Sequence, residues 1–334
     1  MDRAVNIYDI AKESGVSIST VSRVLNNHPN VKKQTKEKVL LVLKNSNYIP
    51  SSVAKSLVNK ATKTIGVLAS DIRHIHYANI AFTIEQKLST YGYNVILCNT
   101  GNDKSKMKDY LRVLAEKQVD GVIMVGSIFS CDQTAESIQR YHSKTPVVMH
   151  NTSLKGDNIY NISSEEAYGI VLAVDYLVQE KGIREIALVL DYDTPVGYQK
   201  HKRYREKLEE YGIPYLKNRV VRTQSGLAGG TAAIEDLTKR GAEFSAVIGC
   251  DDLTSIGAMQ QLERDGRRVP DEVAVIGFNN TLFSQVSSPA MTVIDNKEEV
   301  TGIMLSRAMG DVLSGQAISS QTLIYPELIL RGTT

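Results

Sequence analysis

The stretch GVSISTVSRVLNN, residues 15–27, combines a helical repeat of aliphatic residues with four hydroxyl side chains in six positions. The aliphatic positions are Val16, Val21, Val24 and Leu25. Gly15 is typical of a turn that ends a preceding helix, and Ser17 is placed to cap the next one. We therefore predict a short helix, ending near residue 26, whose outer surface carries small hydroxyls and one arginine.

Two more short helices are predicted around this stretch, within residues 6–45. Ile7, Ile10 and Ala11 give an apolar side to the preceding helix, and Thr35 can cap a following one. Two helices around a glycine turn, braced by a third, form the helix-turn-helix unit. The predicted fold of residues 1–49 is therefore a small all-α helix-turn-helix head.

Charge is concentrated in this head. Residues 1–60 contain ten Lys and Arg against four Asp and Glu, a net charge of +6, while the whole chain carries only +2. A basic module of this kind suits a polyanion such as DNA. Charge alone would equally fit a basic surface without a partner, but the glycine turn and the hydroxyl-rich helix together favour DNA binding.

A recognition helix in the major groove needs short side chains that donate to phosphates and longer ones that reach base edges. The candidates are the phosphate-directed or groove-directed hydroxyls Ser17, Thr20 and Ser22 and the base-directed Ile18, Ser19 and Arg23. Ile18 could contact a thymine methyl group, and Arg23 could reach a guanine or a phosphate. The alternative is an ordinary solvated helix face.

From Thr64 onward the pattern alternates between strands and helices. Strand runs are predicted at 65–69, 94–98, 121–125, 146–150, 185–190, 245–249 and 273–278. Helical stretches lie between them at 104–117, 165–180, 229–239 and 253–264, and Ser163 with Glu166 has capping-box spacing. This alternation indicates parallel sheets covered on both faces, and about 270 residues most naturally form two such lobes. Residues 64–334 are therefore predicted to be a two-lobed α/β core.

Membrane and secreted classes are not indicated. No run of about 18 apolar residues exists, and the N-terminal stretch lacks a signal-peptide core, so a cytoplasmic location without membrane contact is expected. Cys98, Cys131 and Cys250 are odd in number and widely spaced, as expected for reduced thiols.

Catalytic and cofactor patterns are also absent from the sequence. Residues 74–76 (HIH) do not have metal-ligand spacing on a helix. The glycine-rich residues 226–230 lack the Lys-Ser/Thr ending of a phosphate loop and fit a turn into the next helix. We therefore expect no enzyme activity, catalytic residue, metal or cofactor.

Short motifs along almost the whole chain resemble the lactose-repressor (LacI/GalR) family of bacterial transcription regulators. These are residues 8–11 (YDIA), 15–17 (GVS), 20–26 (TVSRVLN), 47–50 (NYIP), 119–123 (VDGVI), 273–278 (VAVIGF) and 289–293 (PAMTV). The resemblance implies a homodimeric, sequence-specific repressor of sugar-utilisation genes that responds to a small-molecule effector. It would bind a near-palindromic double-stranded operator through residues 17–26, Asn26 included, and its fold is that of periplasmic binding proteins.

The resemblance also gives a role to residues 50–63. In this family the segment folds into a hinge helix on operator DNA and pairs with its twin from the other subunit. Leu57 matches the leucine wedged into the minor groove, and Ala54 would let two hinge helices approach closely. The alternative is that Leu57 is a linker residue packed against the core.

The resemblance implies that the cleft between the lobes of this fold binds a small ligand, usually a sugar or a purine, and we expect a sugar or a sugar phosphate here. The matching positions are Tyr77, Lys200, Asp251, Asn279 and Asn296. Carboxylates, amides and an aromatic ring are the groups that a sugar site needs. Asp252 matches an acid that more often braces the loop. A satisfied polar loop residue is the alternative at each position.

The chain departs from the family pattern at residues 200–204 (KHKRY), where an Arg-x-x-Gly-aromatic element is usual. Lys200 stands at the effector-contacting arginine, and lysine is not equivalent to arginine at a bidentate site. Asn279 likewise replaces a common ligand-binding aspartate. Either the effector is unusual, for example anionic, or the stretch is a solvated basic face. We expect Lys200 in the cleft and His201 and Lys202 in solvent.

Three other functions remain open at this point. The first is a corepressor-dependent regulator of the same family. The second is a sugar-binding protein of the periplasmic type, which the basic head and the missing signal peptide oppose. The third is an enzyme such as a sugar kinase with a DNA-binding appendage, which the missing phosphate loop opposes.

Overall fold

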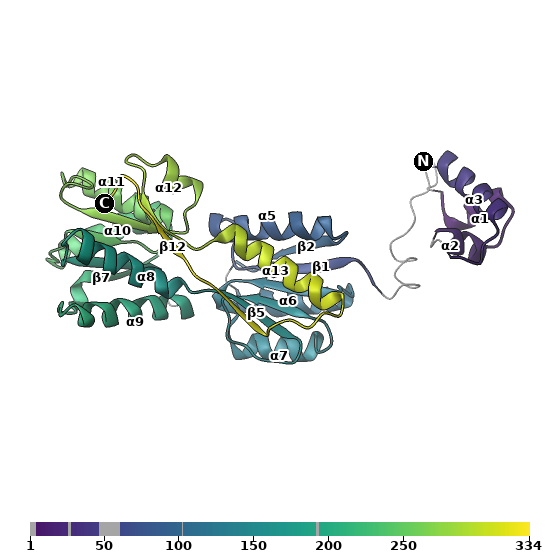
Figure 1. Ribbon diagram of the computed structural model, residues 1–334, viewed down its shortest axis with the longest axis horizontal. Coiled ribbons are helices and arrows are strands. Elements are labelled where there is room, and N and C mark those ends of the chain that lie inside the picture. The colour runs from purple at the N-terminus through teal and green to yellow at the C-terminus, as the bar shows by residue number, and fades with distance from the viewer. Residues whose placement is uncertain (1–4, 26–27, 47–60, 102, 192–193) are drawn as a thin grey trace. The chain divides into compact units, whose positions relative to one another are not determined.

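A computed structural model of the protein describes residues 5–25, 28–46, 61–101, 103–191 and 194–334 (Figure 1). The chain divides into two compact units, Met1–Thr62 and Lys63–Thr334, which we call the head and the core. Among the described residues, no helix is both long enough and apolar enough to cross a bilayer.

The head contains three helices, α1 (Ile7–Ser14), α2 (Ile18–Leu25) and α3 (Lys33–Asn45). A capping box between Asn6 and Asp9 begins α1, and Gly15 ends it in the left-handed conformation with φ 62°, as predicted. The apolar faces of the three helices meet in one small core. Its buried members are Ile10, Ala11, Val21, Val24 and Val39.

The third helix begins earlier than the sequence predicts. Lys32 is its N-cap residue and makes no side-chain capping bond, so Thr35 lies inside the first turn and the prediction that it caps the helix is wrong. The reason is tertiary, because Val31 packs against the head core and turns the chain into the helix three residues sooner.

The core consists of two lobes, each built on one sheet, which confirms the predicted two-lobed α/β class. The lobe 1 sheet has the order β11-β5-β4-β3-β1-β2, and all of its strand pairs are parallel. Its strands are β1 (Thr64–Ala69), β2 (Asn94–Asn99), β3 (Gly121–Val125), β4 (Val147–His150), β5 (Ile159–Ser164) and β11 (Gln321–Ile324).

The lobe 2 sheet has the order β12-β10-β9-β8-β6-β7, in which only the pair β12–β10 is antiparallel. Its strands are β6 (Ile186–Asp191), β7 (Val220–Thr223), β8 (Ala246–Ile248), β9 (Ala274–Phe278), β10 (Thr292–Asp295) and β12 (Glu327–Ile329). The seven strands predicted from apolar runs are all present. Five of the described strands were not among them. These are β5 and β10, which lie inside the sheets, and the short, partly exposed strands β7, β11 and β12, which carry weaker patterns.

Helices cover both faces of each sheet. In lobe 1, α5 (Ile75–Thr90) and α13 (Glu298–Leu313) cover one face, and α6 (Lys104–Glu116) and α7 (Asp132–Tyr141) cover the other. In lobe 2, α8 (Glu166–Asp175) and α9 (Pro195–Glu210) lie opposite α10 (Leu227–Lys239) and α11 (Asp252–Arg264). The short helix α12 (Leu282–Val286) follows β9.

The chain crosses between the lobes after β5, after β10 and between β11 and β12. As a result α5 and α13, which are far apart in the sequence, lie side by side in lobe 1 (Figure 1).

The first crossing also explains why Ser163 does not cap α8. Ser163 is part of β5, and the N-cap residue of α8 is Glu165, whose backbone N–H donates to the Ile324 carbonyl instead.

Glycines allow α10 and α11 to approach each other closely. Gly226 turns the chain into α10 with φ 104°, as predicted for residues 226–230. A Cβ atom on Gly230 would lie 1.9 Å from the Thr254 carbonyl oxygen, and one on Gly257 would lie 2.1 Å from the Leu227 carbonyl oxygen. Both obstacles are backbone atoms, so the helices would have to separate to admit a side chain.

Gly257→Ala is therefore expected to lower the free energy of unfolding by about 1–3 kcal/mol through overpacking. Gly310→Ala in α13 is the matched control, because its Cβ atom would meet only the Tyr91 ring at 3.4 Å. Without a backbone clash, the control should gain about 0.5–1 kcal/mol of helix propensity. Urea unfolding followed by circular dichroism measures both variants, and equal changes in the two would contradict the tight helix crossing.

Candidate functional site

The exposed start of α2 gathers the hydroxyl side chains of the head. The Ser17 hydroxyl accepts a hydrogen bond from the Thr20 backbone N–H at 3.2 Å, as the predicted cap requires. It also lies 2.8 Å from the Ser19 hydroxyl and 2.9 Å from the Thr20 hydroxyl. These three residues therefore form one polar cluster at the helix N-terminus, where backbone N–H groups favour anions.

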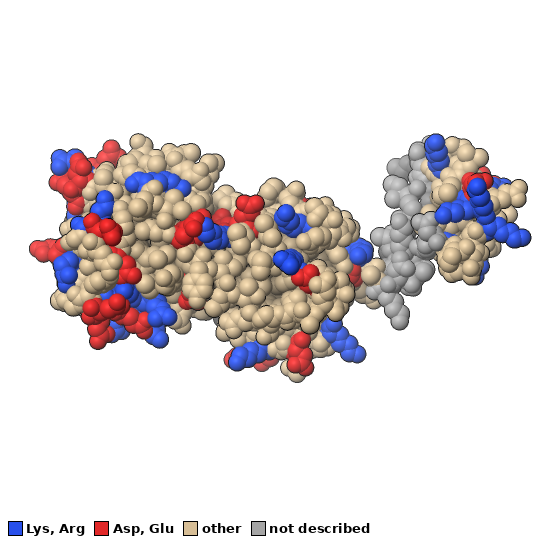
Figure 2. Space-filling model, viewed as in Figure 1, with Lys and Arg blue, Asp and Glu red and all other residues tan. Residues whose placement is uncertain are grey.

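The other predicted DNA-contacting residues on α2 share this outer side. Ile18 and Arg23 are exposed, and Ser22 is half-buried. The face of the head shown in Figure 2 carries mostly Lys and Arg among its charged side chains. Asn26, Ala54 and Leu57, with most of the predicted hinge segment at 50–63, lie outside the described residues.

A cavity of about 750 Å³ lies between the two lobes of the core. It is lined from both sheets, at the carboxyl ends of parallel strands, which is where open α/β folds bind ligands. Of the five predicted effector residues, Tyr77, Lys200, Asp251 and Asn279 line it. Asn296 does not line it but donates from Nδ2 to the Asn279 side-chain oxygen at 2.8 Å. Asn296 therefore positions Asn279.

Lys200 forms a buried ion pair in the cavity wall. Its Nζ lies 2.8 Å from Glu166 Oε2 and 4.2 Å from the centre of the Phe278 ring. Burial lowers the pKa of Lys200, but the charges of Glu166 and Asp191 outweigh it and raise the pKa overall. Burial likewise raises the pKa of Glu166, and Lys200 and His76 reverse this effect. Both groups are therefore charged.

The rest of the basic stretch lies away from the cavity. Lys202 and Arg203 are exposed and reach Glu206 on the next turn of α9. His201 is half-buried and lies 3.0 Å from the Tyr215 hydroxyl, so it is not the solvated residue that the sequence predicts. Only Lys200 of these residues faces the cavity.

Two adjacent aspartates brace the loops at the cavity edge. Asp251 caps α11, because its carboxylate accepts from the Thr254 backbone N–H at 2.9 Å and from the Thr254 hydroxyl at 2.7 Å. Asp252 Oδ2 accepts from the Thr281 N–H at 2.6 Å and from the Thr281 hydroxyl at 2.7 Å. Burial raises the pKa of Asp252 to about 7. Asp252 thus braces the loop, as the resemblance implies, and Asp251 both braces α11 and lines the cavity.

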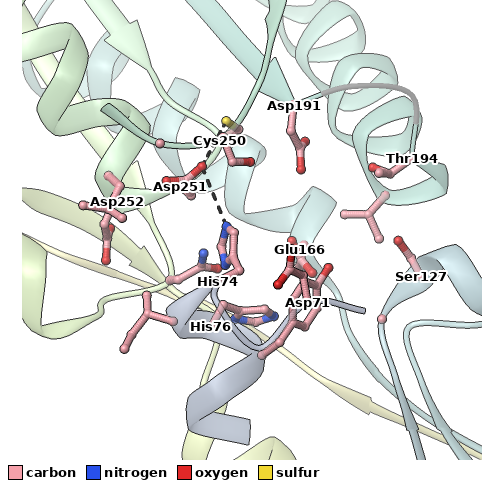
Figure 3. Close-up of a pocket in the computed structure, with 18 of the residues that line it drawn as sticks. Asp71, His74, His76, Ser127, Glu166, Asp191, Thr194, Cys250, Asp251 and Asp252 are labelled. Carbon is pink, nitrogen blue, oxygen red and sulfur yellow. Dashed lines mark hydrogen bonds and ion pairs between the residues drawn. The ribbon is translucent and has the colours of Figure 1, made fainter. Parts of the chain in front are cut away.

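Histidines form part of the lobe 1 wall. His74 Nε2 lies 4.0 Å from Asp251 Oδ2 across the cleft, and burial lowers the pKa of His74 (Figure 3). His76 Nδ1 lies 2.8 Å from Glu298 Oε1 at the start of α13. Within the described ranges, no three or more His, Cys, Asp or Glu residues are arranged to hold a metal ion.

Three acids of the cavity wall, Asp71, Glu166 and Asp191, were not predicted from the sequence as site residues. Asp191 ends β6, directly after a predicted strand run, so its position at a carboxyl strand end was an available signal. Glu166 also accepts from Asn151 Nδ2 at 2.7 Å, and this bond joins the lobes. No local pattern could have found this contact, because it depends on how the lobes pack.

Two family descriptions match the chain. Residues 6–51 match "Bacterial regulatory proteins, lacI family", and residues 62–330 match "Periplasmic binding proteins and sugar binding domain of LacI family". An HTH-type transcriptional regulator of Lachnoclostridium phytofermentans is 34% identical over 332 residues, which cover 99% of each chain.

Solved structures agree with these matches. The lac repressor dimer bound to operator and the anti-inducer ONPF is similar with a TM-score of 0.88 at 25% identity, covering 99% of both chains. The complex of the transcriptional regulator CelR with cellobiose has a TM-score of 0.72 at 25% identity, covering 99% of this chain and 100% of that one. With its helix-turn-helix head and two-lobed core, the chain belongs to the LacI family of bacterial transcriptional regulators.

Proposed function

We propose that the protein is a cytoplasmic, homodimeric repressor that binds a near-palindromic operator. Its affinity for the operator would be controlled by a sugar-class effector bound between the lobes. One observation carries this proposal. The same chain joins a head with exposed hydroxyls on α2 to a core with a cavity of about 750 Å³ lined from both lobes. Such a cavity accommodates a mono- or disaccharide. The protein would act by binding DNA and effector, without catalysing a reaction.

In the head, α2 would enter the major groove of one operator half-site. Ser17, Thr20 and Ser22 would donate to phosphates or the groove wall, and Ile18, Ser19 and Arg23 would contact bases. Asn26 would extend this surface, and Ala54 and Leu57 would act in a hinge at residues 50–63 that forms on DNA. The two-fold symmetry of a dimer then matches two half-sites, as in the operator complex of the lac repressor dimer.

In the core, Tyr77 would lie against the sugar face while Asn279, oriented by Asn296, would bond hydroxyls. Lys200 and Asp251 would complete the polar wall. The cavity is built from both lobes, so a ligand that contacts both changes the angle between them. Coupling of this kind is worth about 1–3 kcal/mol between two sites.

The test begins with selection of a high-affinity duplex from random-sequence DNA by the full-length protein. Fluorescence anisotropy at fixed salt then measures binding of this duplex with and without sugars, amino sugars and sugar phosphates. A tight complex that one compound weakens at least fivefold is the expected result. A complex formed only with a compound would replace the repressor with a corepressor-dependent regulator. Failure to select any specific duplex would overturn DNA recognition by the head.

A further inference from the structure

The charged residues that line the cavity are mostly acidic. Among the described residues these are the acids Asp71, Glu166, Asp191, Asp251 and Asp252 and the bases Arg73 and Lys200. The two histidines of the wall do not restore the balance, because burial lowers the pKa of His74, and His76, whose pKa is raised, is already paired with Glu298. Asp252, with a pKa of about 7, is only partly ionised, but the other four acids still outnumber the two bases. An anionic ligand would therefore bind beside a wall that already has an excess of negative charge.

Both bases are already paired with acids of the same wall. Lys200 is held by Glu166 at 2.8 Å and lies over the Phe278 ring. Arg73 forms a two-pronged pair with Asp71, with its Nε 3.0 Å from Oδ1 and its NH2 nitrogen 2.6 Å from Oδ2. The Arg73 side chain is also 84% exposed, so it faces water. Neither base is free to take a phosphate group.

The acids of the wall differ in the hydrogen-bond donors that their carboxylates have within the protein. Thr254 occupies the carboxylate of Asp251, and Thr281 occupies one oxygen of Asp252. Asp191 is different, because within the described part of the chain the only hydrogen bond to its carboxylate comes from its own backbone N–H. Figure 3 shows this carboxylate pointing into the cavity from the end of β6. Asp252 Oδ1 also has no partner among the described residues, but Asp252 is fully buried, whereas the half-buried Asp191 carboxylate can be reached from the cavity.

We infer that the effector is a sugar-class molecule that carries a protonated amine, and that the Asp191 carboxylate accepts hydrogen bonds from its ammonium group. The inference rests on the proposed function, since it names the chemical class of the ligand for the same cavity. A charge-assisted hydrogen bond is about twice as strong as a neutral one, so an ammonium group would stabilise the half-buried Asp191 carboxylate more than a hydroxyl would. Burial raises the pKa of Asp191, and Lys200 only partly offsets this, so a second cation would stabilise the ionised form.

The competing ligand classes make different demands on the same wall. A neutral sugar would give Asp191 two hydroxyl donors but no charge, leaving the excess of negative charge in place. A sugar phosphate would need a base without an acidic partner, and both bases of the described wall are paired. An amino sugar supplies hydroxyls for the amides and a cation for Asp191.

The experiment is calorimetric titration of the full-length protein with matched sugars. The first set is D-glucosamine, D-glucose and glucose 6-phosphate, the second is galactosamine and galactose, and the third is cellobiose with its diamino counterpart. We expect an aminated member to bind at least tenfold more tightly than its hydroxyl counterpart. Asp191→Asn should weaken binding of the aminated sugar at least 30-fold. Binding of its hydroxyl counterpart should weaken less than threefold. Asp132→Asn removes one charge from an exposed position outside the cavity and should leave both affinities unchanged.

The other outcomes separate this inference from the proposed function. Tighter binding of a hydroxylated or phosphorylated member, or no binding of any aminated member, overturns the inference. Equal losses for charged and neutral members in Asp191→Asn also overturn it, since Asp191 would then accept only hydroxyls. The selected duplex is titrated in the same samples. If the operator complex still forms, DNA recognition by the head stands even where the sugar titrations overturn the inference. Thermal unfolding verifies that both variants fold.

Discussion

Glu166→Ala is expected to lower the free energy of unfolding of the core by about 3–5 kcal/mol, because it leaves the Lys200 ammonium buried without its partner. The Lys200 side chain is only 6% exposed and that of Glu166 only 10%, so water can replace the lost carboxylate only in small part. The substitution also removes the acceptor of Asn151, which joins lobe 1 to lobe 2. Urea unfolding followed by circular dichroism measures the loss.

Glu206→Ala is the matched control for this prediction. Glu206 pairs with Lys202 and Arg203 on the exposed face of α9, the helix that also carries Lys200. Exposed pairs contribute less than about 1 kcal/mol, so the control should unfold close to the parent. The double variant Glu166→Leu with Lys200→Met should recover part of the stability, since it leaves no unpaired charge. A loss in Glu166→Ala no larger than that of the control would show that the pair is not buried in solution.

Removal of residues 1–62 is expected to weaken binding to the selected operator at least about 10³-fold, which is the lower range of specific over non-specific affinity. The predicted recognition hydroxyls all lie in the head, while the core has its own hydrophobic clusters on both faces of each sheet. The shortened chain should therefore stay folded, dimeric and able to bind its effector. Anisotropy at matched salt measures the DNA affinity.

Unrelated duplex DNA of the same length is the control, since the electrostatic part of binding must be subtracted. Sedimentation of the shortened chain checks the dimer. Retention of operator affinity within tenfold would place specific contacts on the core. Sedimentation as a monomer would move the dimer contact into residues 1–62.

The head and the central strands could be predicted because their signals are local. Gly15 and Ser17 mark the ends of α1 and α2 within a few residues, and the strands of both sheet centres are continuous apolar runs. Weak edge strands such as β12 lack such runs, and the interior strands β5 and β10 were missed because polar residues interrupt their short apolar runs. The misplaced caps at Thr35 and Ser163 show the limit of local rules, since tertiary contacts set where those helices begin.

The cavity could be predicted only in part. Lys200, Asp251 and Asn279 were accessible through their family positions, whereas the partner of Lys200 was not, because Glu166 follows a crossing between the lobes. The ion pair also changes what Lys200 indicates. Taken alone it suggested an anionic effector, but in the structure Glu166 already neutralises it. The net charge of a cavity depends on which charged residues pair with each other, and such pairs cannot be recognised when the two residues are far apart in the sequence.

The crossings between the lobes also set the order in which the protein can fold during synthesis. Lobe 1 receives α13 and its edge strand β11 from residues 298–324, which leave the ribosome after most of lobe 2. The apolar surface that α13 covers on α5 therefore stays open on the nascent chain until residues 298–313 have been made. Long-range closure of this kind slows folding and prolongs exposure to aggregation, so this repressor should depend on chaperones while it is made.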